Sequence, residues 1–411
     1  MKEKLGLWIR KNEKIHCILK AFHQLNRAEF RRYVLDYRIG IADEGLTMPD
    51  SFRRETSSGS LHLDVYENGL FDPGKMIYVI TIKSASFGMC SQLTVMMNRL
   101  NFADRLGMIP CIKWCESDLY QEKEPVQGTR NVFEYYFEPV CGITDYKAET
   151  GRFVVYDDLD AHYGFDWIHI PMVDRDYQYT EADLERYADL MNQYIRLRPE
   201  IEQQFLEERE ALFQGKKVLG VHGRGGDMKL AFLSHPLCVT SVEYIEETDK
   251  AMQEIGAELI FLATDDNEIL EAFRQHFQDR VVYYDDVIRT SGRLHNCLVE
   301  TDRPLHRYKL GLEILRDVYT LASCDGLITG VSYVNCVVRF IKKSFHKNFE
   351  FLKTINKGRH KHGKNVNDPQ FLTDNVDLIK KLREAQSGDG EISQKEKQEK
   401  IERILSDFYD S

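Results

Sequence analysis

One segment of the sequence, Val218 to Asp227, combines residue types that could bind a diphosphate. A buried strand is predicted to run into it, and side chains alternate along a strand, so His222 and Arg224 fall on one face. Both then point into the crevice beyond the carboxyl end of the strand, where open α/β sheets bind ligands. Arg224 carries a planar, permanently charged guanidinium that suits a diphosphate. Gly225 and Gly226 remove side chains where phosphates would approach the backbone.

The same segment has a structural interpretation, in which Arg224 pairs with Asp227 to hold a turn. The two interpretations remain open on this segment alone. Neither the glycine pattern of dinucleotide-binding folds nor the Gly-Lys-Ser/Thr of the P-loop is present, which disfavours NAD and ATP as ligands.

Carboxylates follow the next predicted strand and recur in a later helix. Thr264, Asp265 and Asp266 stand directly after the strand. Either aspartate could cap the helix that follows or contact a ligand. Asp317 lies within a predicted helix, where a solvent-facing carboxylate is the usual arrangement. If Asp317 faces the cleft, it could accept the two N–H donors on guanine's Watson–Crick edge, whereas adenine offers only one amino group there.

The elements that must position these residues alternate regularly in the second half of the chain. Apolar, β-branched runs predict strands, and the segments of helical periodicity between them predict helices, so a parallel sheet covered on both faces is expected. The predicted strands are Lys217–Val221, Leu259–Ala263, Val281–Tyr284 and Gly326–Thr329, and the helices are Ser241–Ile255, Asn267–Phe277 and Arg307–Ala322.

The first half predicts a smaller unit of the same kind. A strand leads into a glycine loop around Gly88, followed by a helix and a second strand, which is the opening of a parallel α/β unit. Two helices, one with a capping-box-like start at Thr180 and one opened by Pro199, are predicted to bridge the halves. The segments are strands Met76–Ile82, Met108–Trp114, Phe153–Tyr156 and Trp167–Ile170, and helices Leu93–Leu106, Thr180–Leu197 and Pro199–Phe213.

These elements predict an α/β protein with two Rossmann-like domains and additional helices at both ends. The predicted boundaries are 1–70 for a basic N-terminal helical region, 71–213 for the first domain with its bridging helices, 214–345 for the second domain, and 346–411 for a basic loop and charged C-terminal helices. Residues 1–40 combine an excess of lysine and arginine with apolar side chains. This segment could contact an anionic membrane as a peripheral element or pack as a helix on the body of the protein.

Composition disfavours several classes of function. With 411 residues the chain is long enough for two domains, and no apolar run is long enough to span a bilayer. A net charge of −11 disfavours nucleic acid as a partner, because phosphate backbones are bound by lysine and arginine. The nine cysteines are scattered without Cys-x-x-Cys pairs, which indicates reduced thiols. No secretory signal is evident, so cytoplasmic residence is expected.

Several motifs, in their order along the chain, resemble those of the α1,6-type fucosyltransferases, which include core-fucosylating and nodulation-factor enzymes. The family's His-x-Arg-x-x-Asp motif is matched by His222, Arg224 and Asp227. Its Ala-Thr-Asp-Asp strand end is matched by Ala263–Asp266. Weaker matches, which extend the likeness over residues 76–345, are Ser86–Leu93, Asn131–Pro139, Gly292–Asn296, the helix around Asp317 and Cys324–Thr329.

The resemblance implies a GT-B fold, in which two Rossmann-like domains face a cleft, and an inverting, metal-independent transferase that uses GDP-fucose and no further cofactor. Arg224 would hold the β-phosphate and stabilise the departing GDP. His222 and Asp317 would contact the nucleoside, and Gly88 would let a loop of the first domain close over the donor. An oligosaccharide or lipid-linked glycan at the cytoplasmic face of a bacterial membrane is the implied acceptor. The resemblance implies further donor contacts at Thr264, Asp265, Asp266, His295, Ser332 and Tyr333.

The sequence departs from the family at positions that bear on the donor phosphates. The second arginine of the core-fucosylating members is replaced by Gly225, and the lysine after the motif aspartate by Met228. Their Ser-Ser-Gln at the phosphate site corresponds to Ser332–Val334.

A further departure concerns the group that accepts the acceptor's proton. An inverting transferase needs such a base, and the segment Leu230 to Ser234 contains no carboxylate. Asp227 and His235 are the candidates. The alternatives are that Asp227 orients Arg224 and that His235 begins a turn before Pro236.

Three competing functions remain open. A metal-dependent transferase would use an Asp-x-Asp triplet, which occurs at Asp158–Asp160 and at Asp174–Asp176. A GT-B transferase could use another nucleotide sugar. A homologue that has lost catalysis could bind a nucleotide or glycan without turnover.

Overall fold

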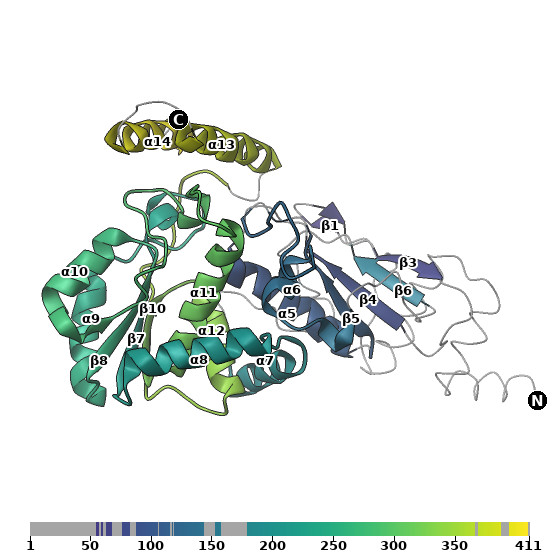
Figure 1. The fold of residues 1–411 in the computed structure, drawn as a ribbon, viewed down its shortest axis with the longest axis horizontal. Helices are drawn as coiled ribbons and strands as arrows, with labels where there is room; N and C mark the ends of the chain where they lie inside the picture. Colours follow the sequence, from purple (N-terminus) through teal and green to yellow (C-terminus); the bar gives the residue numbers. More distant parts are fainter. Residues whose placement is uncertain are drawn as a thin grey trace, which may run out of the picture.

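The computed structural model describes residues 55–56, 59–60, 63–67, 76–82, 88–105, 107–115, 117, 119–143, 153–157, 179–365, 369–387 and 394–409. Within these ranges the chain forms two main β-sheets, one of five and one of four strands, with helices between and around them (Figure 1). The basic segment 1–40, the predicted strand Trp167–Ile170 and most of the glycine loop before Gly88 lie outside the described residues.

The C-terminal sheet has five parallel strands in the order β11-β10-β7-β8-β9. Its outer strand β11 was not predicted from the sequence. Among the described strands, β11 pairs with β10 alone. Its residues Leu352 and Lys353 are exposed, so it lacks the continuous apolar run that marks an interior strand. The bounds are Val218–Gly223 for β7, Leu259–Thr264 for β8, Val281–Val282 for β9, Gly326–Gly330 for β10 and Phe351–Ile355 for β11.

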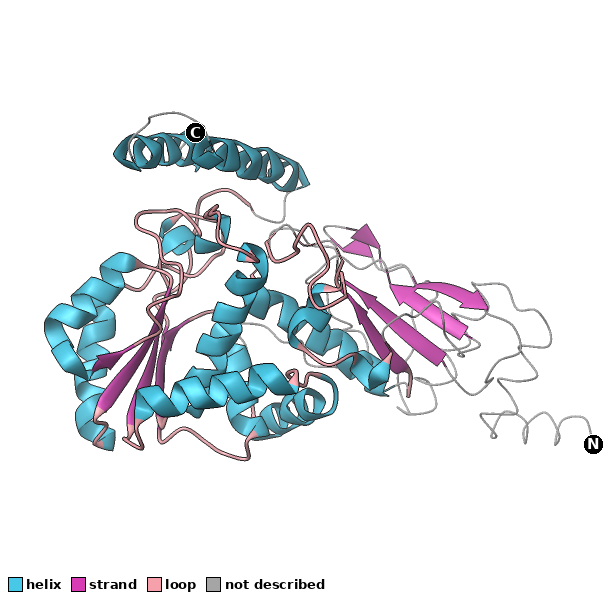
Figure 2. Ribbon diagram, viewed as in Figure 1, coloured by secondary structure: helices cyan, strands magenta, loops and turns pink. Residues whose placement is uncertain are grey.

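Alternation along the strands buries both faces of this sheet. Val218 and Phe261 point into one hydrophobic core, while Leu219 and Ile260 point into a second. Helices α9 and α10 cover the second face, and α11 covers the first (Figure 2). The bounds are Ser241–Ile255 for α9, Asn267–Phe277 for α10 and His306–Ser323 for α11, which agree closely with the predicted helices.

Helix α12, Tyr333–Ser344, follows β10 and was not predicted. Ser332 caps it by accepting a hydrogen bond from the Asn335 backbone N–H at 3.3 Å. The helix packs against α11 and against two helices of the N-terminal half, so its apolar residues are buried on several sides. The sequence of α12 is strongly amphipathic, so this helix could have been predicted from its periodicity.

The N-terminal sheet has the order β3-β6-β4-β5. Strands β4, β5 and β6 are parallel, as expected, but β3 pairs antiparallel with β6. The expectation of a purely parallel first sheet is therefore wrong at this strand, because β3 enters the sheet before the first parallel unit. The bounds are Leu63–Glu67 for β3, Met76–Thr81 for β4, Ile109–Lys113 for β5 and Phe153–Asp157 for β6, and a separate two-stranded pair is formed by β1, Glu55–Thr56, and β2, Gly59–Ser60.

Helices join the two sheets into one body. Helix α7 begins after Thr180 with the predicted capping box, and α8 begins at Pro199 as expected. Tyr136 stacks on Tyr308 of α11 with ring centroids 5.4 Å apart and donates a hydrogen bond to the Tyr308 carbonyl at 2.9 Å. One hydrophobic core runs through both halves. The bounds are Met89–Arg105 for α5, Val132–Tyr136 for α6, Glu181–Tyr194 for α7 and Pro199–Phe213 for α8.

Two C-terminal helices, α13 (Pro369–Ser387) and α14 (Gln394–Tyr409), form a hairpin that packs on the C-terminal half (Figure 1). Leu378, Leu382 and Leu405 enclose Leu294, and Tyr409 packs edge-on against Phe232. Among the described helices, none is both long and apolar enough to cross a membrane. The predicted α/β class, with one main sheet in each half of the chain, is confirmed.

Candidate functional site

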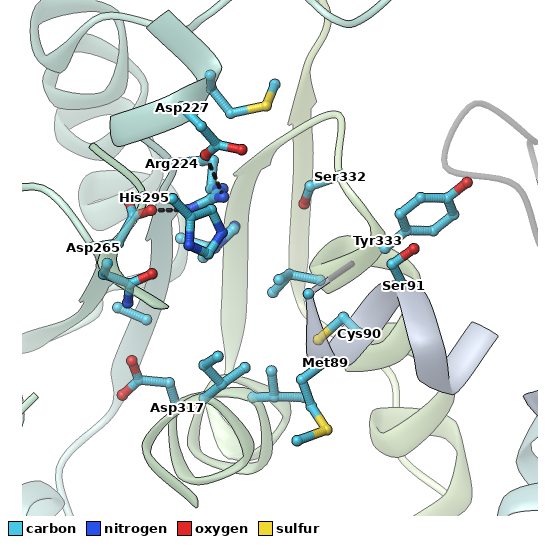
Figure 3. A pocket seen from close by; sticks show the side chains of 18 of the residues that line it. Met89, Cys90, Ser91, Arg224, Asp227, Asp265, His295, Asp317, Ser332 and Tyr333 are labelled. Carbon is cyan, nitrogen blue, oxygen red and sulfur yellow. Dashed lines mark hydrogen bonds and ion pairs between the residues drawn. The ribbon is translucent and has the colours of Figure 1, made fainter. Parts of the chain in front are cut away.

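A cavity of about 440 Å³ lies between the carboxyl ends of the C-terminal strands and the beginning of α5 (Figure 3). Both halves of the chain contribute to its wall. The N-terminal half supplies Gly88, Met89, Cys90, Ser91 and Tyr120. The C-terminal half supplies, among others, His222, Arg224, Asp227, His235, Thr264, Asp265, His295, Glu313, Asp317, Ser332, Tyr333 and Arg359. Every candidate site residue from the sequence except Asp266 lines this one cavity.

Arg224 is held between two carboxylates. Its guanidinium donates to Asp227 Oδ1 at 2.6 Å and forms an ion pair with Asp265, as Figure 3 shows. The Arg224 side chain keeps 23% exposure, whereas that of Asp265 keeps 8%. The pairing of Arg224 with Asp227 that the sequence left open is therefore present, and Arg224 lines the cavity at the same time. The turn interpretation and a ligand-binding role for Arg224 are compatible.

The two glycines after Arg224 are required by the protein's own packing. A Cβ on Gly225 would lie 2.0 Å from Asp266 Oδ2, which is far inside the contact distance. Gly226 has a φ of +53°, and a Cβ there would lie 3.0 Å from the Leu294 carbonyl oxygen. The packing of the chain thus gives a second reason for glycine at these positions, and the predicted role in a ligand's approach stays a prediction.

Replacing Gly225 with alanine should destabilise the fold by about 1–3 kcal/mol, the usual cost of forcing an atom into a packed site. Asp266 would have to move, and it is both the cap of α10 and the partner of Lys229 at 2.7 Å. Gly88→Ala is a matched control, since the nearest atom to its new Cβ would be 3.9 Å away. Urea unfolding of both variants checks this; equal stability of the two would contradict the packing argument.

The two adjacent aspartates after β8 have different roles. Asp265 accepts a hydrogen bond from the Gly225 N–H at 2.9 Å and lines the cavity. Asp266 is 1% exposed and accepts from the Glu268 N–H at 2.7 Å, so it caps α10. The cap interpretation is confirmed for Asp266, which also pairs with Lys229 at 2.7 Å and is not among the residues that line the cavity.

Two histidines in the wall are neutral at pH 7. Burial, together with the charge of Arg224, lowers the pKa of His222 to about 3. Burial lowers the pKa of His295 to about 4, although Asp227 opposes this effect. His295 Nδ1 accepts from the Cys297 N–H at 3.0 Å, so its single proton is on Nε2. These rings can exchange hydrogen bonds with a ligand, but they bring no positive charge.

Asp317 belongs to the cavity wall and not to the outer surface. It lies on α11 at some distance from the Arg224 cluster (Figure 3). Burial raises the pKa of Asp317 to about 7, although Arg289 and Arg316 lower it. The apolar residues Val287, Ile314 and Val318 also line the cavity, and the last two belong to α11 together with Asp317. The solvent-facing alternative is therefore wrong.

Asp227 and His235 differ in how well each could act as the general base. Burial would raise the pKa of Asp227, but opposing interactions, with the charge of Arg224 the largest of them, outweigh burial and leave this pKa below its usual value. A carboxylate that is both paired and hard to protonate is a poor proton acceptor. His235 packs against Phe232, with ring centroids 5.0 Å apart, and also lines the cavity. The geometry therefore favours the orienting role for Asp227.

Two helices begin at the cavity. Tyr333 opens α12 and Met89 opens α5. The N-terminal end of a helix carries partial positive charge and favours anions. Gly88 and the Ser332–Tyr333 pair are thus placed where a phosphate would be stabilised. The Met89 N–H donates to the Tyr120 hydroxyl at 2.9 Å, which fixes the start of α5.

Several wall residues were missed by sequence reasoning. Ser91 and Cys90 belong to α5, which begins at Met89 and not at the predicted Leu93. Glu313 precedes Asp317 by one helical turn and shares its face, a spacing visible in the sequence. Arg359 comes from the basic segment after β11, whose composition was the only signal.

The two Asp-x-Asp triplets considered for a metal, Asp158–Asp160 and Asp174–Asp176, lie outside the described residues. In the part of the chain that the structure describes, no group of three or more histidine, cysteine, aspartate or glutamate side chains is arranged to hold a metal ion.

Comparison with known proteins gives only distant likenesses. No protein-family model and no curated protein matches the chain. The solved structure of NodZ α1,6-fucosyltransferase soaked with GDP-fucose is 18% identical, with a TM-score of 0.37, and the match covers 65% of this chain and 92% of that one. Fucosyltransferase NodZ from Bradyrhizobium is 17% identical over 65% of this chain and 93% of that one, with a TM-score of 0.37. POFUT1 in complex with GDP is 13% identical over 69% and 99%, with a TM-score of 0.39.

Proposed function

We propose that the chain is an inverting, metal-independent glycosyltransferase that transfers fucose from GDP-fucose to an oligosaccharide or lipid-linked glycan. One observation supports this proposal most strongly. Arg224, which suits a phosphate, and Asp317, which suits guanine, line the same cavity although they come from different elements. The cavity volume of about 440 Å³ also falls in the usual range of small-molecule sites.

The guanine end of the proposed site is the part of the cavity around Asp317. Its carboxylate would accept the N1–H and N2–H donors of guanine, which is the pattern that adenine cannot offer. Val287, Ile314 and Val318 supply apolar surface for a flat ring. Binding of two donors would favour the charged carboxylate and offset the burial that raises the pKa of Asp317.

The phosphate end is the cluster around Arg224. When the bond between the sugar carbon and the β-phosphate oxygen breaks, negative charge develops on the leaving GDP. A fixed guanidinium and the N-terminal end of α12 can stabilise that charge without reorganising. Asp227 and Asp265 hold the Arg224 side chain in place for this purpose.

The proposed base is His235. The acceptor hydroxyl would attack the sugar carbon from the face opposite the leaving GDP, and its proton would pass to the imidazole as the new bond forms. His235 and Asp227 line the same cavity, and the two side chains interact electrostatically.

Calorimetric titration with GDP, UDP, ADP and CMP in EDTA tests the donor assignment. We expect GDP to bind at least about 10-fold more tightly than the others, because only guanine matches Asp317. Release of GDP from GDP-fucose and from GDP-mannose then identifies the sugar. Binding only after a divalent metal is added, or preference for another nucleotide, would contradict the proposal. Selective GDP binding without any sugar release or transfer would identify a non-catalytic homologue.

A further inference from the structure

The Arg224 cluster has no surplus positive charge of its own. One guanidinium faces two carboxylates, Asp227 at 2.6 Å and the buried Asp265. A diphosphate brings additional negative charge to the same place, and its burial requires cations that compensate for it. The N-terminal end of α12 offers only partial charge.

A second cation must therefore come from the cavity wall. Among the described residues that line the cavity, Arg224 and Arg359 are the ones with permanent positive charge. His222 and His295 are neutral, because burial lowers their pKa values to about 3 and about 4. Lys229 is nearby in sequence but lies 2.7 Å from Asp266 and 3.1 Å from Glu268.

The residue next to Arg224 cannot supply the cation. A side chain at position 225 would collide with Asp266, as its Cβ alone would lie 2.0 Å from Oδ2. The charge has to reach the cavity from another segment of the chain.

Arg359 is built into the wall by backbone pairing. The segment that carries it runs beside residues 232–237, with bridges between Pro236 and Arg359 and between Phe232 and Lys364. The Leu237 N–H donates to the Gly358 carbonyl at 2.9 Å, and the His360 N–H donates to the His235 carbonyl at 2.9 Å. The Arg359 guanidinium donates to the Ser234 carbonyl. Arg359 is therefore fixed beside His235, at the phosphate end of the cavity.

We propose that Arg359 is a second phosphate-binding residue, which joins Arg224 in holding the diphosphate of the donor. The inference rests on the proposed function, since it assumes a guanosine diphosphate ligand. It assigns a role to the basic segment after β11, which the fold does not otherwise explain. An arginine suits this role because its planar fork can engage two phosphate oxygens at once.

Calorimetric titration of the full-length protein with GDP and with guanosine, in EDTA, tests this proposal. Arg359→Ala should weaken GDP binding by about 10- to 100-fold, the usual loss for a charged hydrogen bond, and leave guanosine affinity within about 2-fold. Arg359→Lys should recover part of the loss. Lys361→Ala is the matched control, because Lys361 lies in the same basic segment and outside the cavity wall, and it should bind both ligands as the unaltered protein does.

The outcomes separate the two proposals. If the unaltered protein prefers GDP to guanosine and Arg359→Ala retains that preference, Arg359 does not bind the diphosphate and the inference is overturned, while the proposed function stands. If the unaltered protein binds neither ligand, the proposed function itself is overturned. An equal loss of GDP affinity in Lys361→Ala would show a general effect of surface charge and would also overturn the assignment of Arg359.

Discussion

Arg224→Ala should lower the rate of sugar release from the donor by about 100- to 1,000-fold, the usual effect of removing one preorganised group that stabilises developing charge. Arg224 stands at the carboxyl end of β7 and is oriented by Asp227 and Asp265. Without it, the leaving diphosphate faces Asp227 and Asp265 and loses the counter-charge that these two carboxylates hold in place. Steady-state measurement of GDP release from GDP-fucose checks the result.

A control is needed because the same substitution leaves Asp265 buried without its partner, which can reduce stability. Guanosine, which has no phosphate, serves as the control ligand and should bind Arg224→Ala as it binds the unaltered protein. Thermal unfolding of the variant shows whether it is folded at the assay temperature. Unchanged turnover in a folded Arg224→Ala variant would refute the phosphate assignment.

Asp317→Asn should reduce the preference for GDP over UDP and ADP by about 10-fold or more. The asparagine amide places N–H donors against the N–H donors of guanine, so buried donors are left without acceptors. Binding of a uracil or adenine nucleotide should change much less. Competition titrations with the three nucleotides check this selectivity, and an Asp317→Asn variant with unchanged selectivity would show that guanine does not lie against α11.

The pH dependence of binding gives a second readout for Asp317. Burial raises the pKa of the Asp317 carboxyl to about 7, so this group is protonated at lower pH. It must lose its proton before it can accept hydrogen bonds from both N–H donors of guanine. GDP affinity should therefore rise with pH between about 6 and 8, by up to about 10-fold per unit below the pKa. In Asp317→Asn this rise should disappear. Measuring proton release by calorimetry in buffers of different ionisation enthalpy checks the sign.

The pKa of Asp317 also predicts the direction of its effect on stability. A carboxyl whose folded pKa lies above its unfolded value stabilises the fold at low pH, and this contribution is lost as pH rises through the folded value near 7. Bound guanine would restore this contribution to stability by pairing with the carboxylate. The protection that GDP gives against unfolding should consequently be larger at pH 8 than at pH 6.

Local sequence signals determined the elements and one end of the site. Apolar runs located β7 and β8, and the capping box at Thr180 and the proline at Pro199 placed the starts of α7 and α8 correctly. These features depend on neighbouring residues alone, so the sequence pattern is sufficient to read them. The alternation along β7 likewise predicted that His222 and Arg224 would share one cavity.

Tertiary packing decided the rest, because it depends on contacts between segments far apart in the chain. Only the folded structure shows that Asp265 faces the cavity while Asp266 caps α10, and that Gly225 is required by Asp266. The antiparallel direction of β3 was set by its pairing with β6, which the residues of β3 alone do not reveal.

The position of Arg359 shows most clearly the difference between local sequence signals and long-range packing. The sequence shows only a basic stretch after β11, which is equally compatible with a solvated loop. Backbone pairing with residues 232–237 brings that stretch to the cavity, and the pairing register selects Arg359 from among its basic neighbours. Residue types and their local order thus determined the chemistry available to the site, while long-range pairing decided which charges meet there.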